Sequence, residues 1–252
     1  MNIIRVKLPE GVIRLKPFTV KDYLDFLLIR KEIEESPDSA KVILDELLEE
    51  LYPEYDKNYR AYIFITVFAI SIGKNVLPVR YKCKQCGKTK KYPFNLALKE
   101  IKPAVLETAG IKITFKFTTS VTTDVYELFE NCVDTVSDGI NTYKWSELTQ
   151  DLKDQILAVI TIEDFDKIMK EIYPIYIELD LSCCNTHKVV YTDFVDIYRL
   201  LVSDEELIMM YKINHLMTSH NYSISEVLSM TPMERTITLA LIEADIKAKS
   251  GK

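Results

Sequence analysis

The sequence YKCKQCGKTKKYP, residues 81–93, places two cysteines three positions apart within a strongly basic stretch. Short extended patterns at residues 79–83 and 89–96 lie on either side of it. A zinc ribbon presents two thiolates in this way, because the tight turn directs both sulfur atoms toward one point and Gly87 permits the unusual backbone. A thioredoxin-like redox pair is disfavoured, because that motif belongs at a helix N-terminus after a buried strand.

The second half of this metal site is expected at residues 176–194, YIELDLSCCNTHKVVYTDF, where a strand, turn and strand pattern recurs. A Cys-x-x-His in this segment has the same spacing as the first Cys-x-x-Cys. Four protein ligands leave no position for water, so the sequence predicts one structural zinc ion per chain. The predicted ligands are Cys83, Cys86, Cys184 and His187, with Cys183 as the alternative third ligand. The alternative without metal makes the adjacent cysteines small buried apolar residues and leaves the histidine exposed.

The composition limits the classes of function that fit. The chain has 252 residues, 48% of them hydrophobic, which is enough to bury a core. Its formal net charge of −6 disfavours broad attraction to nucleic acid, so such contact would have to be local. Five cysteines argue against a framework of disulfides. We expect a cytoplasmic protein without membrane contact, because no signal sequence is recognisable and the most apolar run, residues 61–73, is shorter than the roughly 20 residues of a membrane span.

Local signals predict the elements on the N-terminal side of the first cysteine pair. Two alternating stretches flank a turn at residues 9–11 and predict a β-hairpin. Thr19 and Asp22 form a variant of the capping box before a helix. An amphipathic helix should then end at Pro53, and a buried helix over residues 59–72 should end at Gly73.

The remaining segments predict an insertion and a helical C-terminus. Residues 111–122 alternate as in a strand, and residues 146–160 and 163–173 have helical patterns. An insertion with closely spaced ends would bring the two cysteine-containing turns together. Capping motifs at residues 223–226 and 231–234 predict helices in a methionine-rich region that forms either a core or a groove for a partner.

The predicted fold class is α+β and mostly helical. It comprises an N-terminal β-hairpin, helices, a split zinc-ribbon-like β unit with a helical insertion, and a C-terminal helical segment. The expected division is residues 1–78 for the hairpin and helices, 79–100 and 176–196 for the split ribbon, 101–175 for the α/β insertion, and 197–252 for the C-terminal helices.

No pattern for catalysis is present in the sequence. It lacks a glycine-rich phosphate loop, a Gly-x-Ser-x-Gly elbow and a His-Glu-x-x-His helix. The acidic residues at positions 163–166 suit the first turn of a helix, where carboxylates favour the dipole. We therefore expect a protein that is not an enzyme, with no catalytic or cofactor-binding residues. The main alternative is a zinc-ribbon protein that binds nucleic acid or assists transcription through its lysine-rich turn.

Several motifs occur in a characteristic order along the chain. They are LPEGVIRLKPFTVKDYLDFL, YRAYIFITVFAISIGKNV, VRYKCKQCGKTKKYPFNL, ELDLSCCNTHKVVYTDF and HNYSISEVLSMTPMERTITLALI. Together they resemble the baseplate hub subunit family of T4-type contractile-tailed bacteriophages. The resemblance covers most of the chain and matches Cys83, Cys86 and Cys184 to paired-cysteine knuckles, with His187 where a second cysteine is expected.

The resemblance implies a bacteriophage tail protein, either a hub component or a hub assembly factor. Its partners would be other baseplate and tail subunits. It would act in the host cytoplasm during assembly, and would then either remain in the baseplate of the virion tail or leave it. The resemblance carries no catalytic site to this chain.

Overall fold

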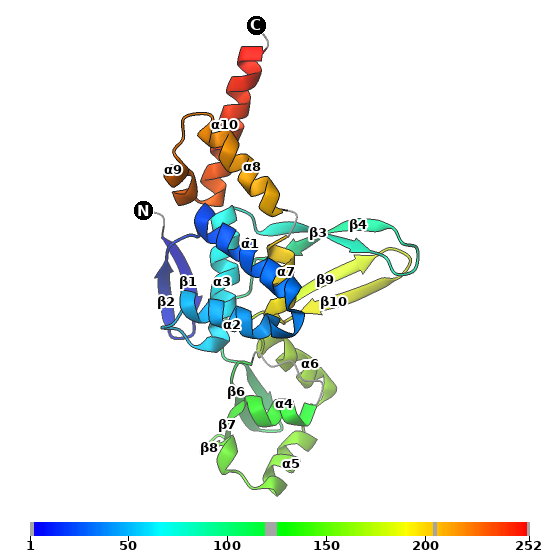
Figure 1. The fold of residues 1–252 in the computed structure, drawn as a ribbon. Helices are drawn as coiled ribbons and strands as arrows, with labels where there is room; N and C mark the ends of the chain where they lie inside the picture. The colour runs from blue at the N-terminus through cyan, green and yellow to red at the C-terminus, as the bar shows by residue number, and fades with distance from the viewer. Residues whose placement is uncertain (1–2, 119–124, 204–205, 251–252) are drawn as a thin grey trace.

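A group of packed helices forms the centre of the computed structural model, which describes residues 3–118, 125–203 and 206–250. Three parts project from this body: a pair of β-hairpins to one side, a small α/β unit at one end and a C-terminal helical unit at the other (Figure 1). The predicted class, α+β and mostly helical with an N-terminal hairpin and C-terminal helices, is confirmed.

The N-terminal elements follow the predicted order, although α3 begins two residues before its predicted start and the short helix η1 was not predicted. They are the antiparallel strands β1 (Ile4–Leu8) and β2 (Gly11–Leu15), and the helices α1 (Val20–Glu35), η1 (Pro37–Ser39), α2 (Ala40–Leu51) and α3 (Lys57–Ile72). Thr19 and Asp22 form the expected capping box of α1. Gly73 ends α3 in the left-handed conformation, with a φ of 66°.

Helix α3 is the centre of the main core. From Ala61 onward it is almost entirely apolar, so this part is buried on most sides, and Phe64 is fully enclosed. The ring of Phe64 packs against Phe18, Phe26 and the side chains of α7 (Phe194–Leu201). Tyr198 of α7 is itself fully buried and donates a hydrogen bond of 2.8 Å to the carbonyl of Phe26. The chain on either side of the insertion is therefore joined in one core.

Helix α2 shows where periodicity alone misplaces a residue. Leu44, Leu47 and Leu48 face the core as an amphipathic helix requires. Val42, which the sequence pattern also places on the buried side, is 59% exposed. The helix packs through a narrow stripe, so a residue at the edge of that stripe stays in solvent.

Two hairpins form the lateral projection, which we call the arm. The first consists of β3 (Val76–Lys82) and β4 (Thr89–Asn95), and the second of β9 (Ile177–Ser182) and β10 (Thr186–Tyr191). Each hairpin is an antiparallel pair, and β4 lies beside β9. The arm thus unites two segments that are far apart in the sequence (Figure 1).

The insertion between the hairpins is a four-stranded antiparallel sheet covered by helices. Its strands follow one another in the order β5 (Val105–Thr108), β6 (Ile111–Phe115), β7 (Val133–Ser137) and β8 (Thr142–Lys144). Its helices are α4 (Val125–Cys132), η2 (Trp145–Glu147), α5 (Gln150–Ala158) and α6 (Ile162–Glu171). The strand predicted over residues 111–122 ends at Phe115, and residues 119–122 lie outside the described part of the chain.

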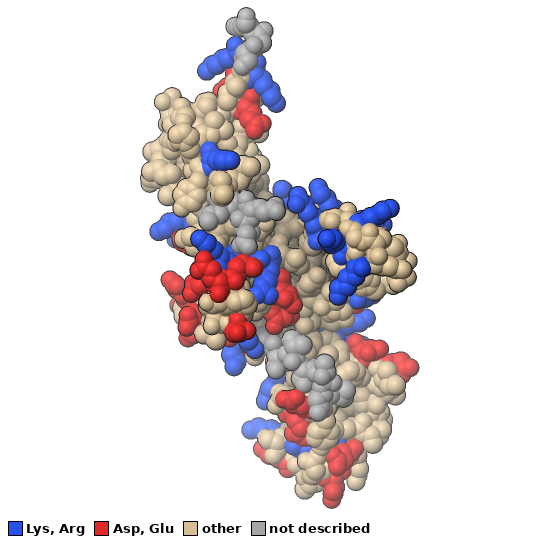
Figure 2. All heavy atoms as spheres, turned by 45° about the vertical axis from the view of Figure 1, so that its right-hand side comes forward, with Lys and Arg blue, Asp and Glu red and all other residues tan. Residues whose placement is uncertain are grey.

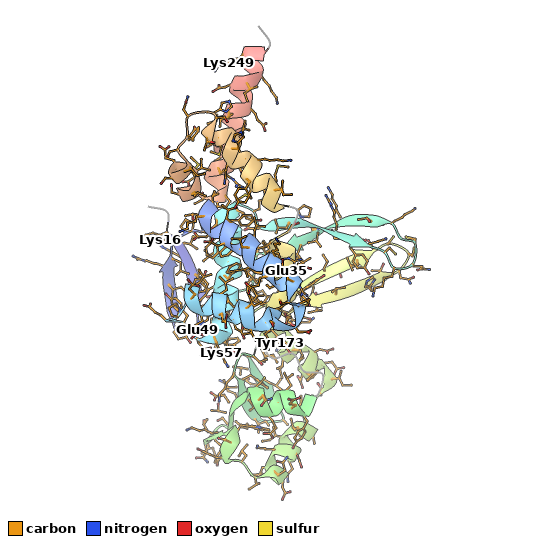
Figure 3. All side chains as sticks on the ribbon, viewed as in Figure 1. Lys16, Glu35, Glu49, Lys57, Tyr173 and Lys249 are labelled. Carbon is orange, nitrogen blue, oxygen red and sulfur yellow. The ribbon has the colours of Figure 1, made fainter. Side chains whose placement is uncertain are left out.

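The C-terminal unit contains α8 (Glu206–Thr218), α9 (Ile224–Ser229) and α10 (Pro232–Ser250). Its small core consists of Met217, Val227 and Ile242. The last turns of α10 extend away from the body, with Lys249 near the tip (Figure 3). In the described residues, no helix has the length and apolar content to cross a membrane.

Candidate metal centre

The first turn of the arm shapes the chain around two cysteines. The amide of Gly87 donates to the carbonyl of Cys83 at 2.9 Å, and the amide of Cys83 donates to the carbonyl of Lys88 at 2.9 Å. Gly87 has a φ of 69°, which favours glycine because it has no Cβ atom to clash. This compact turn leaves Cys83 buried and Cys86 exposed at the end of the hairpin.

The second turn brings two adjacent cysteines to the same place. Strand β9 ends at Ser182, and the amide of Cys183 donates to the carbonyl of Asn185 at 3.3 Å across the turn. In a regular strand, neighbouring side chains point to opposite faces. Here the chain has left the strand, so the thiols of Cys183 and Cys184 both lie near the first turn.

Contacts between the hairpins fix the relative position of the two turns. Tyr92 and Lys90 of β4 both donate hydrogen bonds to the carbonyl of Ser182, at 2.7 and 3.0 Å. Tyr92 also packs with Leu179 and Leu181 of β9 in a core of three buried residues. This core is small, so the far end of the arm depends on additional interactions between the turns.

Four thiols meet at the end of the arm. The sulfur atoms of Cys83, Cys86, Cys183 and Cys184 all lie within 4.8 Å of one another. The Cys86 and Cys183 sulfurs are 3.5 Å apart, too far for a disulfide bond, and all five cysteines of the chain are free. A tetrahedral zinc ion with Zn–S bonds of about 2.3 Å places its sulfurs about 3.8 Å apart. The four-cysteine cluster is therefore compatible with a metal site in its donor chemistry and its dimensions.

Hydrogen bonding and crowding shift the pKa values of three of the four thiols. Backbone amides of Cys86 and Gln85 donate to the Cys83 sulfur and lower the pKa of this thiol to about 6. Hydrogen bonding to Cys86, burial and the nearby thiolate raise the pKa of Cys183 and of Cys184. A divalent cation would replace these protons and remove the repulsion between thiolates.

His187, one of the four ligands expected from the sequence, lies beside the cluster but is not a member of it. It stands on β10 opposite Leu181, and its Nε2 atom is 3.5 Å from the hydroxyl of Tyr81. It lines a cavity of about 200 Å³ together with Cys83 and Cys183. The structure thus brings Cys83, Cys86 and Cys184 together, and places Cys183 rather than His187 with them.

The acidic residues at the start of α6 have a structural role, because one of them caps the helix. Asp164 accepts hydrogen bonds from the hydroxyl of Thr161 at 2.9 Å and from its amide at 3.3 Å, which completes a capping box. The fifth cysteine, Cys132, is buried in the core of the insertion beside Trp145 and Phe129. Burial raises the pKa of this thiol.

An exposed apolar surface lies on α10 of the C-terminal unit. Met233, Ile237 and Leu241 follow one another at four-residue intervals, so they share one side of the helix, and they are 49%, 51% and 63% exposed. We call these three residues the α10 stripe. Sequence periodicity identified the helix but could not show which of its apolar sides is covered by the rest of the chain.

Comparison with known families assigns the chain. Residues 1–199 match the model of the T4 bacteriophage base plate protein family. Residues 201–247, which contain most of the C-terminal unit, match the C-terminal domain of the baseplate hub assembly protein Gp51. No curated protein and no solved structure matches the chain. The first match covers well over half of the 252 residues, so the chain belongs to the T4 bacteriophage base plate protein family.

Proposed function

We propose that this protein is a non-enzymatic component or assembly factor of the phage baseplate hub, which acts in the host cytoplasm through contacts with other tail subunits. The observation that carries this proposal is the pair of consecutive family matches, because the second describes a hub assembly domain. Membership of a baseplate family supports a role in assembly, and the descriptions of the two matched families name no enzymatic reaction.

The surface of the C-terminal unit supports a function in binding other proteins. No charged residue occurs on α10 between Arg235 and Glu243, and the α10 stripe lies in this interval and just before it. On α8, Ile208, Met209 and Tyr211 are also more than half exposed. Figure 2 shows that, apart from the charged tip of α10, the face of this unit turned to the viewer carries few charges. Exposed apolar surface that is poor in charge is typical of the centre of a protein interface.

For the arm, we propose one structural zinc ion held by Cys83, Cys86, Cys183 and Cys184. Four cysteine ligands complete a tetrahedral shell, so no position remains for a reacting water or substrate. The ion would lock together two turns whose shared core has only three buried residues. The arm would then be a rigid extension of the body.

A contact assay tests the proposed role of the C-terminal unit. The protein is co-expressed with the hub subunits of its phage, and complexes are purified through a tag on this chain. We expect Ile237→Glu with Leu241→Glu to remove the hub subunits from the complex, because two charges in an apolar contact would lose their hydration. The matched control is Val12→Glu with Ile140→Glu, which also changes two exposed residues, on β2 and in the insertion.

The test depends on whether the two pairs of substitutions differ in the amount of hub subunits that co-purify with the chain. Loss of the complex with the α10 pair alone would support contact through the C-terminal unit. Equal retention in both pairs would show that the α10 stripe is not the contact surface. Failure of the unsubstituted chain to associate with any hub subunit would contradict the proposed role itself.

A further inference from the structure

The hairpin β3–β4 carries an unusual concentration of positive charge. The sequence contains six basic residues from Arg80 to Lys91, and no acidic residue occurs between Asp56 and Glu100. All six side chains are exposed, and we call five of them the basic face: Arg80, Lys82, Lys84, Lys88 and Lys91. The sixth, Lys90, binds the carbonyl of Ser182. Figure 2 shows Lys and Arg gathered over the projecting arm.

This arrangement of charges should destabilise the hairpin. Arg80 and Lys91 are direct partners across the two strands, and both are exposed. Like charges directly opposite one another in an antiparallel pair are destabilising. Where a local rule of stability is broken without an evident structural gain, a functional reason is expected.

Neither the candidate metal site nor ion pairing accounts for the charge of the lysines. A divalent cation with four thiolates has a net charge of −2, which is smaller than the charge of the six basic residues. Within the described residues, Lys82, Lys84, Lys88 and Lys91 form no ion pair. On the other hairpin, Glu178 forms ion pairs with Lys188 and with Lys170 of α6. The basic face therefore keeps an excess of positive charge directed to solvent.

We propose that the basic face is a docking surface for an acidic segment of a partner protein. The same outward side of the hairpin carries exposed Val76, Pro78 and Pro93 next to the charges, so an acidic segment with some apolar residues fits it. Pro78 and the lysines also prevent addition of a further strand at the edge of β3, so recognition would use side chains.

The position of the aromatic residues favours a protein over a nucleic acid. Tyr92 is buried and bonded to Ser182, and the half-buried Tyr81 packs edge-on against it at 6.4 Å between ring centroids. Both rings lie on the inward side of the hairpin, so they provide no platform on which bases could stack. The net charge of −6 over the whole chain also opposes a long polyanion. Only the identity of the partner as a tail subunit rests on the proposed function.

The test uses the full chain as purified and two labelled probes. One is an acidic peptide composed of Asp, Glu and Leu, and the other is duplex DNA of similar total charge, both measured by fluorescence polarisation at physiological ionic strength. The variant Arg80→Gln with Lys91→Gln removes charges from the strands without touching a cysteine. We expect it to weaken peptide binding by about tenfold or more, since two charged contacts are lost. The matched control is Lys112→Gln with Lys144→Gln on the exposed surface of the insertion sheet.

Folding of the variant is checked by two measurements. We expect its thermal midpoint to remain unchanged or rise, because a repulsive pair is removed, and its metal content to equal that of the unsubstituted chain. If either falls, Lys82→Gln with Lys88→Gln takes its place. Weakening by the basic-face pair alone supports the proposal. Equal weakening by both pairs, no binding of the peptide, or tighter binding of DNA than of peptide would overturn it, and the last result would assign the arm to nucleic acid. These results do not depend on co-purification with hub subunits, so the two proposals can fail separately.

Discussion

The composition of the candidate metal site gives the sharpest prediction, because Cys183 and His187 are the alternatives for one place in the ligand set. We expect Cys183→Ser to weaken zinc binding strongly and His187→Ala to leave one ion per chain. The thiol of Cys183 lies in the four-sulfur cluster, with its sulfur 3.5 Å from that of Cys86. The imidazole of His187 instead lies against Tyr81, 5.9 Å away between ring centroids.

The magnitude follows from the number of ligands. Structural zinc sites bind with an apparent free energy of about 10–16 kcal/mol, so each of four ligands accounts for roughly 3 kcal/mol. Replacing one soft thiolate with a hydroxyl should therefore weaken the affinity by about 100-fold or more. The arm should also loosen, because the core that the two hairpins share near the turns is small, with Tyr92, Leu179 and Leu181 as its buried residues.

Two measurements check this prediction. Native mass spectrometry with metal analysis gives the number of ions per chain, and competition against a chromogenic chelator gives the affinity. Hydrogen exchange then follows the amides of β4 and β9, which should lose protection in Cys183→Ser, while those of α3 should not. Cys132→Ser is the control, since this thiol lies in the separate core of the insertion.

The opposite outcome would refute the reasoning directly. Full metal content in Cys183→Ser together with loss of metal in His187→Ala would establish the Cys-x-x-His set. A chain that contains no metal in any preparation would mean that the four thiols form a reduced cluster without an ion.

Two further predictions concern pH and the backbone. The raised pKa values of Cys183 and Cys184 mean that a metal ion must displace at least two protons at neutral pH, so its apparent association constant should rise by about 100-fold or more per pH unit there. Chelator competition across this range measures the slope, and a slope near zero would contradict this prediction. Gly73→Ala should cost about 1–2 kcal/mol in chemical denaturation because of its left-handed φ, and up to about 1 kcal/mol more because a Cβ atom would lie 2.9 Å from the sulfur of Met233, a flexible side chain that can shift in part. Gly110→Ala, with nothing within 4 Å, should cost only the first of these, about 1–2 kcal/mol. Equal costs at the two glycines would exclude the contact with Met233 as a source of destabilisation.

Local signals were sufficient for much of the helical body. The capping box of Thr19 and Asp22, the continuous apolar content of α3 and the left-handed Gly73 each act within a few residues. Their structure could be predicted because neighbouring positions along the chain decide it. The sheet of the insertion was predicted less well, since its short strands β7 and β8 are held by pairing with each other and with β6.

The candidate site was predictable in part. The spacing of Cys83 and Cys86 indicated a metal-binding turn, and the second cysteine-containing turn was recognised from its flanking strands. The choice between Cys183 and Cys184 could not be made from alternation, because both lie in a turn where the alternation of a strand no longer holds. The structure places both in the cluster.

The sequence by itself therefore determined the class of the fold, the ends of its main helices and the two turns that supply thiols. Only the tertiary structure decided which donors meet, since Cys86 and Cys183 are 97 positions apart and are brought together by the packing of β4 on β9. It also decided which apolar and basic side chains remain exposed for partners. Secondary structure follows from interactions between near neighbours, whereas a site and a surface depend on how distant segments pack.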